Sequence, residues 1–153
     1  GVEGEIGFSF EASFDRTSYE IREKSAEYTG TSAGMHTAAA GVYLATMGPE
    51  GMKDLGELIM HRCAYAKKKF SRLNGVKVKL SGVSFKEFVA DFSGTGKTVE
   101  EINKKLLEKN IIGGFDLSAV YEGMDNHMLI CVTEIHSKED IDSFADAVAE
   151  IIG

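Results

Sequence analysis

The chain has 153 residues, of which 43% are hydrophobic and 27% charged, which is ordinary for a globular protein with one sizeable core. Its net charge of −7 argues against nucleic acid as a partner, because a polyphosphate backbone needs a basic surface. No apolar run reaches the roughly 18 residues that a membrane helix needs, so we expect a soluble protein with no membrane partner.

Cys63 and Cys131 have no CxxC companion. We expect two buried thiols of a reducing, cytoplasmic compartment, with a disulfide as the alternative.

The first residues are Gly-rich and do not include a starting Met, which predicts a fragment of a longer protein. Residues 1–30 show little periodicity and are expected to be an irregular lead-in to one domain over residues 31–153.

Two helices are predicted in the first half of that domain. Residues 31–47 carry the small and apolar side chains of a tightly packed helix. Gly48 can supply a left-handed position that ends it, and Pro49 suits the first turn of the next helix. The basic run Lys67–Lys69 falls late in this second helix, where the helix dipole favours cations, and we expect it to be a solvated face. An apolar stripe with three- and four-residue spacing defines the second helix: Met52, Leu55, Ile59, Cys63, Ala66, Phe70 and Leu73.

After Asn74-Gly75 the apolar period changes from 3.6 to 2, which predicts strands. Residues 76–80 are expected to form a half-buried strand, and residues 85–92 a second strand that pairs back as a hairpin. Residues 98–101 form a capping box that begins a helix, and residues 111–114 follow as a short extended piece. Residues 127–134 are predicted to be a central strand, and the final helix starts at residues 137–140. This order predicts an α+β domain (α/β by some schemes) with an antiparallel sheet and helices packed on one face.

Several motifs that suggest chemistry have a better structural interpretation. The segment 94–98 resembles a phosphate-binding loop, but Asp91 stands where that loop requires Gly, so we expect a flexible turn capped by Thr98. Both cysteines lie in apolar settings and are expected to be packing residues rather than nucleophiles. The four histidines have no spacing typical of a metal site: His36, His61, His127 and His136. The sequence therefore predicts no catalytic residue, no bound cofactor and no metal in this chain.

Two places remain as candidate site segments. Gly113 and Gly114 follow an apolar pair and would allow close backbone approach or positive φ, so that Asp116 is delivered just beyond them. The alternative is a turn with an Asx-type hydrogen bond. Thr133 and Glu134 end a buried strand in polar groups, where sheets tend to present site residues, and the alternative is a strand end that meets solvent.

The segment IIGGFDLSAVYEGMDNHMLICVTEIHSKEDID, residues 111–142, resembles the C-terminal region of glycine dehydrogenase (decarboxylating) subunit 1. This subunit is the first half of the split P-protein of the glycine cleavage system. Segments 48–51, 64–66, 85–89 and 22–24 are similar to further segments of the same family, whereas residues 25–31 depart from its pattern. The matching residues within the long segment are Gly113, Gly114, Asp116, Leu117, Tyr121, Met128, Leu129, Cys131, Val132, Thr133 and Glu134.

The resemblance implies the small C-terminal domain of an aspartate-aminotransferase-like (fold type I) enzyme dependent on pyridoxal phosphate, with residues 1–30 leading in from a missing large domain. The intact protein would be an oxidoreductase of glycine catabolism that works as a hetero-oligomer with glycine dehydrogenase subunit 2. Subunit 2 would hold pyridoxal phosphate, and the aminomethyl group of glycine would pass to the lipoyl H-protein. The fragment alone would be inactive. The residues implied as substrate or interface contacts are Arg22, Lys24, Gly113, Gly114, Asp116, Thr133 and Glu134.

A different class of function fits the order of elements equally well. The chain could be a free-standing small α+β module that binds a metabolite or mediates assembly. If the chain is instead part of a glycine dehydrogenase subunit 1, the apolar helix at residues 38–47 is expected to be covered by missing parts of the protein or by a partner.

Overall fold

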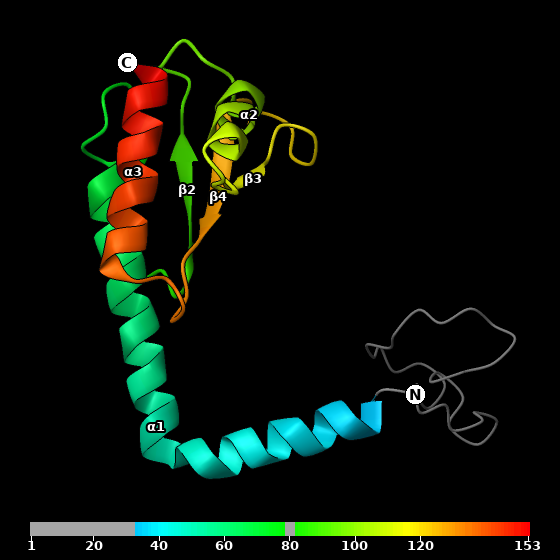
Figure 1. The fold of residues 1–153 in the computed structure, drawn as a ribbon. Coiled ribbons are helices and arrows are strands. Elements are labelled where there is room, and N and C mark those ends of the chain that lie inside the picture. Colours follow the sequence, from blue (N-terminus) through cyan, green and yellow to red (C-terminus); the bar gives the residue numbers. More distant parts are fainter. Residues whose placement is uncertain (1–32, 79–81) are drawn as a thin grey trace, which may run out of the picture. The chain divides into compact units, whose positions relative to one another are not determined.

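The computed structural model describes residues 33–78 and 82–153 (Figure 1). Two units are present, residues 1–48 and residues 49–153, and every strand among the described residues belongs to the second. The predicted lead-in, with Arg22 and Lys24, lies outside the described residues. The elements in chain order are α1 (Ala33–Phe70), β1 (Lys77–Val78), β2 (Glu87–Asp91), α2 (Val99–Glu108), β3 (Phe115–Asp116), β4 (His127–Cys131) and α3 (Lys138–Ile152).

Helix α1 is interrupted where the sequence predicts a break. Gly48 has φ 62° and ψ −178°, so it leaves the helical conformation at positive φ, and Pro49 opens the helical segment that continues to Phe70. A residue with a Cβ would be strained at this φ, which explains why glycine stands here.

The sheet has the order β1-β2-β4-β3, and every neighbouring pair is antiparallel. The predicted hairpin is confirmed, because Lys77 pairs with Asp91. The predicted central strand is confirmed as well, since β4 pairs with β2 on one side and with β3 on the other. Strand β3 itself was not expected, because two residues are too few to show a periodicity.

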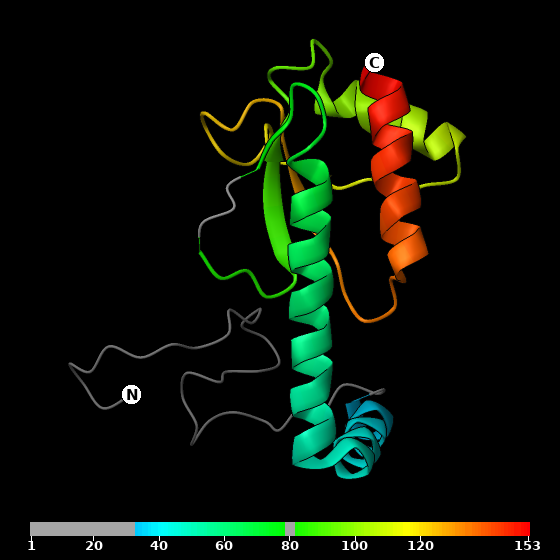
Figure 2. The same ribbon diagram turned by 90° about the vertical axis from the view of Figure 1, so that its left-hand side faces the viewer.

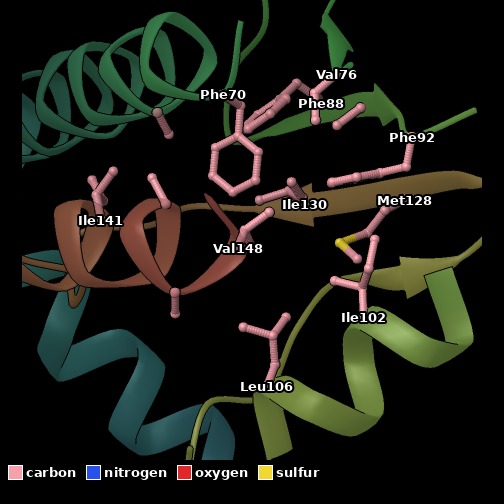
Figure 3. Close-up of a cluster of buried hydrophobic side chains, with 14 of the residues drawn as sticks. Phe70, Val76, Phe88, Phe92, Ile102, Leu106, Met128, Ile130, Ile141 and Val148 are labelled. Atoms are coloured by element: carbon pink, nitrogen blue, oxygen red, sulfur yellow. The ribbon is translucent and has the colours of Figure 1, made fainter. Parts of the chain in front are cut away.

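One face of the sheet is buried under the helices, as predicted for this fold class (Figure 3). Alternate residues of β2 and β4 point inward, in keeping with the two-residue period of a strand. Phe70 of α1 joins the layers, since its ring centroid lies 5.8 Å from that of Phe88 and 5.1 Å from that of Phe144. Figure 2 shows α3 running beside the part of α1 that follows Pro49. The core residues include Cys63, Ala66, Phe88, Ala90, Ile102, Leu106, Met128, Ile130, Ile141 and Val148.

The two capping boxes form as the sequence predicts. Thr98 Oγ1 accepts from the N–H of Glu101 at 3.2 Å, and the Thr98 N–H donates to Glu101 Oε2 at 2.9 Å. Ser137 and Asp140 make the same reciprocal pair at the start of α3. Residues 93–96 form a turn ahead of Thr98, which confirms the turn interpretation of the segment that resembles a phosphate loop.

Two expectations about side-chain exposure are wrong. The basic run is not uniformly solvated: Lys67 is only 6% exposed, and Lys69 pairs with Asp142 at 2.8 Å. Cys131 is exposed, because it falls in the outward register of β4, opposite to Met128 and Ile130. Cys63 is buried as predicted, and burial raises the pKa of its thiol. Both cysteines are free thiols.

Among residues 33–78 and 82–153, no helix is both long and apolar enough to cross a membrane.

Candidate functional site

The two candidate segments lie next to one another at one edge of the sheet. Phe115 pairs with Leu129 in the antiparallel register, which brings Gly113 and Gly114 beside the end of β4. The chain leaving β4 at Cys131 then turns through Thr133 and Glu134 into α3. The structure therefore brings the glycine pair and this polar turn to the same region.

The glycine pair is required by close packing and not by positive φ. Positive φ occurs at other glycines of the described chain but at neither Gly113 nor Gly114, so that part of the expectation is wrong. A Cβ on Gly114 would collide with the Leu129 carbonyl oxygen and the Met128 side chain of β4. A Cβ on Gly113 would collide with the Asn103 side chain of α2. The expected close backbone approach is thus confirmed, and it is directed into the fold.

Asn103 ties this connection to α2 and was not predicted from the sequence. Its Nδ2 donates to the Gly114 carbonyl oxygen at 2.9 Å. Its Oδ1 is buried and has no hydrogen-bond partner among the described residues. Asn103 sits between the buried Ile102 and Leu106, and a polar residue beside an apolar stripe was the only signal that could have found it.

Asp116 has a local structural role in the described chain. Its Oδ1 accepts from the Ser118 N–H at 2.9 Å, which is the Asx-type turn that we gave as the alternative. Asp116 pairs with Met128 of β4. The glycine pair precedes Phe115 and therefore lies toward the other end of β4, near Cys131. A role for Asp116 as a substrate or interface contact stays a prediction.

The turn after β4 is fixed mainly through its backbone. The Thr133 N–H donates to His136 Nδ1 at 3.0 Å, so the proton of a neutral His136 ring is assigned to Nε2. Arg62 of α1 donates to the Glu134 carbonyl oxygen. With the backbone held in this way, the Glu134 side chain is exposed and Ile135 is 77% exposed. Arg62 and His136 were not predicted as site residues, because their roles depend on contacts between distant segments.

A hollow of about 320 Å³ lies between the glycine pair, the end of β4 and the first turns of α3. Most of its wall is apolar, and Asp140, which also lines it, is engaged in the cap of α3. Such a hollow suits a small, mainly apolar group. Within the described ranges, no group of three or more potential ligands could hold a metal ion. The residues with polar side chains at the hollow are Asn110, Cys131, His136, Asp140 and Ser143.

The sequence of this chain is similar to those of known proteins of one family. The family model described as "Glycine cleavage system P-protein" matches residues 15–148. A "Probable glycine dehydrogenase (decarboxylating) subunit 1" of Shouchella clausii is 36% identical over 131 residues, which is 86% of this chain. The protein of that name from Bacillus thuringiensis is 35% identical over 130 residues. This chain spans only 28% of the length of either relative.

A solved structure agrees on the fold. The crystal structure of a glycine decarboxylase (P-protein) of the glycine cleavage system, in inhibitor-bound form, superposes with a TM-score of 0.70 at 23% sequence identity. The superposition covers 85% of this chain and 29% of the solved chain.

Proposed function

Because this chain belongs to the glycine cleavage system P-protein family, we propose that it is the small C-terminal domain of a glycine dehydrogenase (decarboxylating) subunit 1. In this proposal the missing large domain joins at the N-terminal side, through residues 1–30. The full protein forms a cytoplasmic hetero-oligomer with subunit 2, decarboxylates glycine and passes the aminomethyl group to the lipoyl H-protein.

The observation that carries the proposal is the similarity to subunit 1 over 86% of this chain. The packing of the similar segments supports it. Tyr65, from the segment 64–66, donates its hydroxyl proton to Asp142 Oδ1 at 2.6 Å. Phe88, from the segment 85–89, pairs with Ile130 within the long segment. Residues that resemble the family at separate places in the sequence thus stabilise one core.

Pyridoxal phosphate, when bound, supplies an electron sink for the carbanion that forms as glycine loses carbon dioxide. Neither the hollow beside β4 nor the groove beside α1 offers a free lysine for this group. The hollow beside β4 has no lysine in its wall for a Schiff base. A second groove, beside α1, includes one lysine, Lys67, which is nearly buried and already donates from its Nζ to Ser84 Oγ. We therefore assign the cofactor to subunit 2 and no catalytic step to this chain.

The contribution of this chain is then to shape and assemble the enzyme. The exposed Glu134 and Ile135 lie on a turn that Arg62 holds in place, which suits a contact with the large domain or with subunit 2. The helical segment before Gly48 leaves apolar side chains exposed, including Met35 at 82% and Val42 at 67%. Exposed apolar surface of this kind marks an interface, and we assign its cover to the large domain.

A chimera tests the proposal. The matched region of the Shouchella clausii subunit 1 is replaced by this chain, and the chimera is combined with that organism's subunit 2 and H-protein. Decarboxylation of glycine is measured by release of labelled carbon dioxide. We expect the chimera to be active, and this chain mixed with subunit 2 and H-protein to be inactive.

Subunit 1 lacking the matched region is the control, and it should be inactive because the small domain is missing. A chimera that folds and binds subunit 2 but does not decarboxylate glycine would contradict the proposal. In that case the free-standing binding or assembly module becomes the better hypothesis.

A further inference from the structure

A groove of about 360 Å³ lies between α1 and the residues that lead into β2, with walls distinct from those of the hollow beside β4. One wall is a single face of α1, since its residues recur at three- and four-residue steps. The other wall is formed by residues 82–84. The lining residues are Glu57, Met60, His61, Ala64, Lys67, Gly82, Val83 and Ser84.

Lys67 lies at one end of this groove and is nearly buried. Only 6% of its surface is exposed, and its Nζ donates to Ser84 Oγ at 3.0 Å. Among residues 33–78 and 82–153, no carboxylate forms an ion pair with it. An ammonium group has three donors, and taking it out of water is costly unless an opposite charge accompanies it. The groove therefore presents a nearly buried cation that forms no ion pair with a carboxylate of the described residues.

The rest of the groove restricts which anion fits. Met60, Ala64 and Val83 give it an apolar wall, and Val83 is 88% exposed at the mouth. Glu57 lies ten residues before Lys67, about 15 Å along the helix axis. A ligand with a second negative charge at that end of the groove would be repelled by the Glu57 carboxylate. Lys67 is the only Lys or Arg among the lining residues, so the fork of donors that a phosphate group prefers is not present.

We propose that this groove binds a small monocarboxylate, with the carboxylate on Lys67 and Ser84 and a short apolar substituent against Met60, Ala64 and Val83. His61, which shares the groove, adds a ring nitrogen near the ligand. This site goes beyond the proposed function, because it needs neither the large domain nor subunit 2.

The test is a titration of the 153-residue chain with butyrate, followed by amide chemical shifts in NMR. We expect saturable shifts at Gly82, Val83 and Ser84. Lys67→Met keeps the buried aliphatic stem and removes the charge, and it should weaken binding about tenfold or more, as expected for the loss of a charge-assisted hydrogen bond. Lys68→Met, at the exposed neighbouring position, is the matched control and should bind as the unmodified chain does.

Val83→Asp keeps the test decisive if Lys67→Met fails to fold, because Val83 is exposed and tolerates a polar side chain. A carboxylate placed at the mouth should abolish butyrate binding, whereas Val83→Asn, which loses the apolar contact but adds no charge, should weaken it by a smaller factor. Shifts that grow linearly without saturation, or that persist in both Lys67→Met and Val83→Asp, would overturn the proposal. Inorganic phosphate binding as tightly as butyrate would overturn the assignment to monocarboxylates.

Discussion

The two segments that flank β4 are held in place by opposite means. The segment before it, residues 111–116, lies so close to its neighbours that Gly113 and Gly114 leave no room for a Cβ. The segment after it, residues 132–142, is held by side-chain hydrogen bonds and ion pairs at the surface. The first segment is limited by space, whereas the second adds donors and charges at the surface to the packing of Val132 and Ile141. Substitutions in the two segments should therefore differ in size, in pH dependence and in what can rescue them.

The largest effect is expected for Gly114→Ala. The added methyl group would collide with the Leu129 carbonyl oxygen, and β4 cannot retreat because Leu129 is itself paired in the sheet with Val89. We expect a loss of about 1–3 kcal/mol in the free energy of unfolding, as for other overpacked sites. Urea denaturation followed by circular dichroism measures it.

Gly56→Ala is the matched control for that experiment. A Cβ at Gly56 of α1 would meet no atom within 4 Å, and alanine favours a helix over glycine by about 1 kcal/mol. This variant should be as stable as the unmodified chain or more stable. Equal stability of Gly114→Ala and Gly56→Ala would show that the connection before β4 is not tightly packed.

The same comparison shows what the sequence can predict. The helix break at Gly48, the hairpin of β1 and β2 and the two capping boxes follow local rules, because the residues that form each feature are close in the sequence. The central place of β4 follows from its apolar composition. The resemblance in residues 111–142 also pointed to the correct family.

Features that depend on distant contacts could not be predicted in this way. Lys67 looks like part of a solvated basic run, and only the approach of Ser84 to the helix makes it a nearly buried lysine. The glycine pair was recognised, but the partner that requires Gly113, Asn103 of α2, is ten residues earlier and has no motif. The register of β4 decided the exposure of Cys131, and a shift of one residue would have buried it.

A smaller effect is expected for Gly113→Ala, because a side chain and not a strand backbone blocks the added methyl group. Asn103 can rotate away at the cost of its hydrogen bond to the Gly114 carbonyl oxygen. We expect a loss of about 1 kcal/mol, close to the value of one such bond.

A double-mutant cycle with Asn103→Ala identifies the cause of that loss. If Asn103 is the obstacle, Gly113→Ala should cost less in the Asn103→Ala background, with a coupling of about 0.5 kcal/mol or more between the two positions. Urea denaturation of the four proteins measures this coupling. Additive effects would mean that Gly113 is constrained by something other than Asn103.

The smallest effect at neutral pH, and the only one that should depend on pH, is expected for Asp142→Asn in α3. The Asp142 carboxylate accepts from Lys138 Nζ at 2.6 Å, from Lys69 Nζ at 2.8 Å and from the Tyr65 hydroxyl at 2.6 Å. These donors, Lys138 foremost, hold the pKa of Asp142 well below its ordinary value, and the same contact raises the pKa of Lys138 to about 12. A carboxyl group whose pKa is lower in the folded state stabilises the fold above its unfolded pKa.

The stabilisation by Asp142 should therefore be complete above about pH 5 and disappear as the pH falls through the folded pKa. Because Asp142→Asn removes the titrating group, its stability should fall less steeply than that of the unmodified chain below about pH 4, so that the two stability curves converge in acid. Urea denaturation at a series of pH values from roughly 2 to 7 measures the convergence of the two curves. Asp146→Asn, at an exposed position one turn further along α3, is the control for the loss of one negative charge from this helix. Parallel curves for Asp142→Asn would mean that this cluster does not hold α3 against α1, and that the segment after β4 depends on packing as the segment before it does.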